Sequence, residues 1–104
     1  MDKRQVVEHV RRYADAVLRD LDVDRIVLFG SYARGTARDD SDIDVAVIVD
    51  TLTEDWFTLA TRLHKLTRDI DINIEPVLLQ KASDRSGFLQ HVLDTGEVVY
   101  QRPA

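Results

Sequence analysis

The hydrophobic residues of this chain recur with the period of a helix in three separate segments. Apolar side chains fall at three- and four-residue spacings in residues 3–20, 53–68 and 82–94, which is the spacing that gives a helix one buried face. A fourth, much shorter helix is expected through Ala33 and Arg34, because Ser31 can cap its start and Gly35 can end it. The pattern therefore predicts four helices, of which three are amphipathic.

The segments between these helices carry the patterns of strands. Residues 24–29 form a short apolar run, which is typical of a buried strand, whereas residues 42–50 and 69–75 alternate between apolar and polar positions. Pro76 has no N–H for a ladder hydrogen bond, so the strand that leads into it should be an edge strand or contain a bulge. A short last strand is expected at residues 98–100.

Helices and strands alternate along the chain, which predicts an α/β (α+β) fold with a small mixed sheet of three to four strands flanked by helices. With 104 residues, of which 44% are hydrophobic, we expect a single domain over residues 1–104. There is no apolar run long enough to span a membrane, no signal peptide at the start and no cysteine. These features together favour a cytoplasmic protein.

The net charge of −5, from 19 acidic and 14 basic residues, bears on the choice of ligand. A protein that grips an extended nucleic acid normally has a basic stripe, since neutralising phosphates supplies most of its affinity. This chain has no cluster of lysines, so long DNA or RNA is a poor candidate for its partner. A single nucleotide held through a metal ion is compatible with the acidic composition.

Two aspartates and a glycine–serine turn carry the candidate chemistry. Asp42 and Asp44 alternate along an expected strand, so their carboxylates point to one face and can share a divalent cation. Asp71 would join them if its strand lies alongside, and three carboxylates so close repel one another unless a cation such as Mg²⁺ neutralises them. Gly30 and Ser31 follow a buried strand, where free backbone amides can hold phosphate. Alternating acids are more often just the solvent face of a strand, so it is their combination with this turn that indicates metal-assisted chemistry on a nucleotide.

The pair Gly30–Ser31, the ten residues after it and the pair Asp42-x-Asp44 resemble the signature of the nucleotidyltransferase superfamily, whose fold is that of the DNA polymerase beta palm. The run Gly-Ser-Tyr-Ala-Arg-Gly-Thr-Ala and the shortness of the chain resemble, in particular, the minimal nucleotidyltransferases (MNT proteins) of prokaryotes. The resemblance covers roughly residues 24–100.

This resemblance implies contacts to the nucleotide. Gly30 and Ser31 would hold the β- and γ-phosphates, the serine through its hydroxyl and backbone amide. Arg34 and Arg38 are candidates for the triphosphate, and a position on the surface is the alternative for both.

The resemblance also implies the metal-binding and catalytic set. Asp42 and Asp44 would bind metal, and Asp71 would bind a second ion and help to deprotonate the acceptor hydroxyl. Residues 70–76 resemble the polymerase beta strand that supplies this third acid, and Glu75 stays open as the alternative to Asp71.

For function, the resemblance implies transfer of AMP from ATP to a hydroxyl, with two Mg²⁺ ions as cofactor. The usual context of minimal members implies an antitoxin that modifies a tyrosine of a helical HEPN toxin, its partner in a hetero-oligomer. Two alternatives stay open: a catalytically silent antitoxin that neutralises its partner by occlusion, and a transferase that modifies a small molecule such as an antibiotic.

The histidines and two adjacent aromatic residues receive simpler interpretations. His9, His64 and His91 fall on expected helices without the spacing of metal ligands, so we expect them at ordinary surface or boundary positions. Trp56 and Phe57 are expected in the core or at an interface rather than against a nucleobase.

Overall fold

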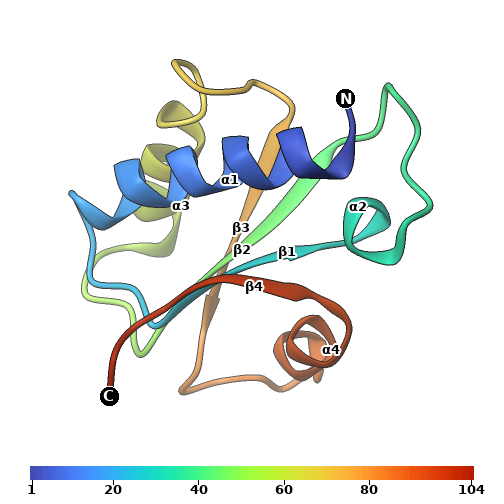
Figure 1. Ribbon diagram of the computed structural model, residues 1–104. Helices are drawn as coiled ribbons and strands as arrows, with labels where there is room; N and C mark the ends of the chain where they lie inside the picture. Colours follow the sequence, from blue (N-terminus) through green and yellow to red (C-terminus); the bar gives the residue numbers. More distant parts are fainter.

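The computed structural model describes residues 1–104 and contains four helices and four strands (Figure 1). In chain order they are α1 (Lys3–Leu18), β1 (Arg25–Phe29), α2 (Ser31–Arg34), β2 (Ile43–Val49), α3 (Trp56–Lys65), β3 (Ile74–Gln80), α4 (Phe88–Thr95) and β4 (Glu97–Gln101). This order confirms the predicted alternation, including the short helix after the first strand and the short last strand. None of the helices has both the length and the apolar character needed to cross a membrane.

The four strands form one mixed sheet in the order β3-β2-β1-β4. β1 pairs antiparallel with β2 and with β4, whereas β2 and β3 run parallel. β3 is therefore an edge strand, as Pro76 predicts, because an edge tolerates a residue that cannot donate to the ladder. The fold class expected from the sequence, a small mixed sheet flanked by helices, is confirmed.

The helices cover the two faces of the sheet unequally (Figure 1). α1 and α3 lie on one face and enclose the main core, to which β2 contributes its three valines. α4 lies on the opposite face, where Leu89 and Val92 pack in a smaller cluster with Val27, Ala46 and Ile48. Because this cluster stops at the middle of β2, the face under α4 is only partly covered.

Side-chain hydrogen bonds fix α1 at its start and against α3. Asp2 and Gln5 form a capping box, in which Gln5 N donates to Asp2 Oδ1 (2.9 Å) and Asp2 N donates to Gln5 Oε1 (3.0 Å). The hydroxyl of Tyr13, which is fully buried, donates to the Leu63 carbonyl of α3 at 2.8 Å. Burial raises the pKa of Tyr13, so the donor stays protonated and ties the two helices together.

The structure corrects the start of the helix expected over residues 53–68. α3 begins only at Trp56, because the Asp55 side chain accepts a hydrogen bond from Thr58 N at 3.1 Å and caps the helix there. Trp56 and Phe57 are 52% and 71% exposed. They are therefore not part of the core. Of the two positions expected for them, the core is excluded and an interface stays open.

The bounds of the strand expected over residues 69–75 are wrong, since β3 begins only at Ile74 and continues through Pro76 to Gln80. The residues before it form a turn, in which Asn73 N donates to Asp71 Oδ1 (2.9 Å) and Ile74 N donates to the Asp71 carbonyl (3.1 Å). The side-chain bond gives the backbone an alternative to the ladder. Ile72, at the middle of the alternating pattern, is accordingly 76% exposed.

Candidate active site

A row of three residues crosses the sheet at the rim of the partly covered face. Phe29 of β1 pairs with Asp44 of β2, and Asp44 pairs with Glu75 of β3. The neighbours of these residues along each strand point into the main core beneath α1 and α3, so alternation directs the three side chains to the opposite face. We call Phe29, Asp44 and Glu75 the rim row. Asp42 lies just before β2, two positions from Asp44, and is exposed.

Gly30 brings the backbone against Asp44 at one end of the rim row. It follows β1 with φ 74° and ψ −149°, a conformation that is essentially open only to glycine. A Cβ at this position would collide with Asp44 Oδ2. The chain then enters α2 at Ser31, and the first N–H groups of a helix have no partner within it. The glycine–serine turn and the Asp44 carboxylate therefore lie side by side.

Negative charge gathers around Asp44. Burial raises the pKa of Asp44, and the charges of Asp42 and Glu75 raise it further, whereas Arg34 of α2 lowers it. The structure thus brings two further carboxylates and one guanidinium within electrostatic reach of Asp44. A cation placed among the three carboxylates would relieve their mutual repulsion.

The donor groups at the rim fit a divalent metal ion only in part. No group of three or more histidine, cysteine, aspartate or glutamate side chains is arranged to hold an ion by itself. Mg²⁺, however, is usually bound by one or two carboxylates together with waters and substrate phosphates. The oxygens of Asp42 and Asp44, beside a turn suited to phosphate, match that mode. The residues therefore fit Mg²⁺ bound jointly with a nucleotide, and the charge repulsion around Asp44 favours such binding.

Asp71 does not lie with the other acids. Its side chain is 7% exposed, and His9 Nδ1 of α1 lies 2.9 Å from Asp71 Oδ2, within hydrogen-bond distance. Because α1 covers the face opposite the rim row, this contact holds Asp71 on the far side of the sheet. Glu75, the alternative third acid, is the carboxylate that the structure places beside Asp44.

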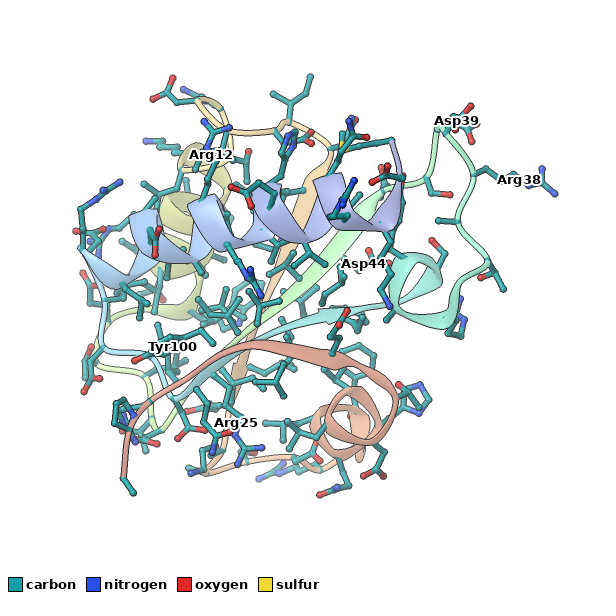
Figure 2. The ribbon with its side chains drawn as sticks, viewed as in Figure 1. Arg12, Arg25, Arg38, Asp39, Asp44 and Tyr100 are labelled. Carbon is teal, nitrogen blue, oxygen red and sulfur yellow. The ribbon has the colours of Figure 1, made fainter.

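The loop between α2 and β2 leaves the rim open. Figure 2 shows Arg38 and Asp39 on this loop, with the Arg38 side chain directed away from Asp44. None of the larger surface hollows includes Asp42, Asp44 or Glu75, and the largest, about 440 Å³, lies between α1 and α3. The candidate site is therefore an open part of the sheet surface that a second molecule can approach.

Comparison with known proteins identifies the family. Residues 14–104 match the model of the family described as "Polymerase beta, Nucleotidyltransferase", and the chain therefore belongs to this family. A relative from Methanocaldococcus jannaschii, named "Putative protein adenylyltransferase", is 31% identical over 99 residues, which cover 92% of this chain and 97% of the relative.

Two solved structures share the fold. A crystal structure of a nucleotidyltransferase from Sulfolobus solfataricus, described as putative, superposes with a TM-score of 0.72 over 96% of this chain and 84% of that chain. Its identity of 20% makes this a likeness of fold alone. A crystal structure described as a toxin-antitoxin with AMP-PNP superposes with a TM-score of 0.65 at 31% identity, over 88% of this chain and 73% of that chain. Family and fold thus agree with the nucleotidyltransferase expected from the sequence.

Proposed function

We propose that this protein transfers AMP from ATP to a tyrosine hydroxyl of a HEPN-type toxin partner, with Mg²⁺ as cofactor, and so acts as an antitoxin. The observation that carries the proposal is the convergence of Asp42, Asp44 and Glu75 beside Gly30. The name of the archaeal relative supports protein adenylylation, and the toxin–antitoxin structure with AMP-PNP supports both the nucleotide and the kind of partner.

In the proposed reaction the acceptor oxygen attacks the α-phosphorus of ATP. A new O–P bond forms while the bond from that phosphorus to the oxygen bridging to the β-phosphate breaks, and pyrophosphate leaves with the bridging oxygen. Gly30 and Ser31 hold the departing phosphates, and Arg34 adds positive charge beside them. Asp42 and Asp44 would hold Mg²⁺, which would neutralise the charge that develops on the phosphates.

We assign the third carboxylate to Glu75 in place of Asp71. Glu75 stands next to Asp44 in the parallel register of β2 and β3 and is exposed, so its carboxylate can take the proton from an acceptor hydroxyl at the rim. Asp71 hydrogen-bonds His9 and Asn73 N on the other side of the sheet. Its role in the proposal is to hold the turn that leads into β3.

The open surface around Asp42, Asp44 and Glu75 favours an acceptor presented by another protein. A small acceptor would need a pocket to hold it, and no larger hollow of the surface lies at the rim. A folded partner supplies its own shape and can place a tyrosine at an exposed site. This is the observation that favours a protein over an antibiotic as the acceptor.

The test is label transfer to the product of the neighbouring gene. ATP labelled in its α-phosphate is incubated with Mg²⁺ and both proteins, and the partner is separated and counted. We expect label on the partner, none from ATP labelled in its γ-phosphate, and none with the double variant Asp42→Ala/Asp44→Ala. A double variant that still neutralises the partner, with no label transferred by the wild type, would replace this proposal with neutralisation by occlusion.

A further inference from the structure

An aromatic pair stands directly beside the rim. Phe88, the first residue of α4, packs edge-to-face on Phe29 with ring centroids 5.7 Å apart and an interplanar angle of 81°. Phe29 is part of the rim row and immediately precedes Gly30, so the pair adjoins both Asp44 and the candidate phosphate turn. Phe88 is nevertheless 38% exposed. Part of an aromatic side chain is thus left open to solvent beside a site for a charged ligand.

The structure holds Phe88 in place. Its backbone N–H donates to Ser86 Oγ at 3.2 Å, and the next two amides of α4 donate to the Asp84 carboxylate at 2.9 and 3.0 Å. One turn further on, Val92 is fully buried against the sheet. The exposed ring therefore sits on an anchored helix start, so little conformational freedom would be lost when a planar ligand packs on it.

The in-line geometry of the transfer indicates whether the aromatic pair lies beside the donor nucleotide or beside the acceptor. In the proposed function the Gly30–Ser31 turn, which directly follows β1, holds the leaving pyrophosphate, so an in-line acceptor would enter from the opposite side, where Glu75 lies on the edge strand β3. Phe29 and Phe88 lie on the β1 side of Asp44, away from that entry. The aromatic pair therefore adjoins the donor nucleotide and not the acceptor.

We infer that Phe88, supported by Phe29, forms the stacking surface for the nucleobase of the donor nucleotide. The inference rests on the proposed nucleotide transfer and adds to it the residue that contacts the base. Stacking accepts any base with a π-face, so this surface provides affinity for a nucleoside triphosphate over inorganic triphosphate without choosing strongly among bases.

The test compares ATP with inorganic triphosphate, which has the phosphates but no base. Binding of each is measured with Mg²⁺ by calorimetry for the wild type, Phe88→Ala, Phe88→Leu and Phe88→Tyr. Phe88→Leu keeps apolar bulk but removes the π-face, and Phe88→Tyr restores it. Phe57→Ala, which truncates a 71% exposed aromatic residue on α3, is the matched control.

We expect Phe88→Ala to weaken ATP binding by about 5- to 100-fold. The affinity of Phe88→Leu for ATP should lie between those of Phe88→Ala and the wild type. Binding of inorganic triphosphate should not change in any variant, and Phe88→Tyr and Phe57→Ala should bind ATP like the wild type. Equal loss for both ligands would overturn the inference, because the phosphate turn would then be what was damaged. Unchanged ATP binding in Phe88→Ala would also overturn the inference. The proposed AMP transfer, which label transfer by the wild type tests, would be unaffected by that result. A wild type that binds neither ligand would instead remove the proposed function, and this inference with it.

Discussion

Replacing Gly30 by alanine should damage both the fold and AMP transfer, whereas the same replacement at Gly35 should damage only the fold, and to a smaller degree. Both glycines have a positive φ, 74° at Gly30 and 78° at Gly35. At Gly35 a Cβ would meet no atom within 4 Å, and the backbone is ordinary left-handed helix with ψ 18°. The two positions therefore separate backbone strain from a collision at the rim.

The magnitudes follow from these geometries. A left-handed residue other than glycine costs about 1 kcal/mol, which is the loss of unfolding free energy expected for Gly35→Ala. The conformation of Gly30, with ψ −149°, costs about 1–3 kcal/mol for alanine, and the collision with Asp44 adds to this. Displacing a catalytic group by about 1 Å can lower a rate about 100-fold, so Gly30→Ala should transfer AMP at least that much more slowly.

Urea unfolding and label transfer measure the two effects. The sharpest control is Gly30→Ala made in an Asp44→Ala background, where the colliding carboxylate is gone. We expect the stability cost of Gly30→Ala to fall there, with a coupling of about 0.5–3 kcal/mol between the two positions. An equal cost in both backgrounds, or a cost no larger than that of Gly35→Ala, would refute the reasoning.

Three further predictions concern one charge at the site and two hydrogen bonds on the opposite face of the sheet. Burial and neighbouring carboxylates raise the folded pKa of Asp44 above its ordinary 3.8, so its ionisation destabilises the fold increasingly as pH rises from that value through the folded pKa. Asp44→Asn should therefore be more stable than the wild type in urea at pH 7, and this advantage should vanish near pH 3. Tyr13→Phe should lose about 1 kcal/mol of stability in the same assay, because the Leu63 carbonyl loses its buried donor, and should keep its transfer rate. His9→Ala should likewise cost about 1 kcal/mol through its bond to Asp71 and leave transfer unchanged.

Local sequence rules predicted much of this molecule because the signals lie within one segment. The helical and strand periods, a short apolar run and the turn residues together predicted the order of all eight elements, and Pro76 correctly indicated an edge strand. The spacing from Gly30 to Asp42 and Asp44 indicated the candidate site residues before any strand pairing was known. The boundaries were less predictable, since the side chain of Asp55 decides where α3 begins.

The choice between Asp71 and Glu75 as the proposed third acid could not be made from the sequence, because it depends on contacts between distant segments. Asp71 sits in an alternating run, but its side chain closes a turn and meets His9, 62 positions away along the chain. No periodicity records such a contact. Phe29 and Glu75 became recognisable as neighbours of Asp44 only through the register of three strands. His9 likewise carried no signal beyond an ordinary position on a helix.

The most direct test of the account compares Glu75→Gln with Asp71→Asn in the transfer of α-labelled AMP to the partner protein. Both variants remove one carboxylate charge and keep the size of the side chain, and only Glu75 lies in the rim row. We predict that Glu75→Gln lowers the transfer rate at least about 100-fold. Asp71→Asn should keep the wild-type rate when equal amounts of folded protein are compared. The opposite ranking, or a wild type that transfers no label, would contradict the assignment of the rim row as the catalytic site.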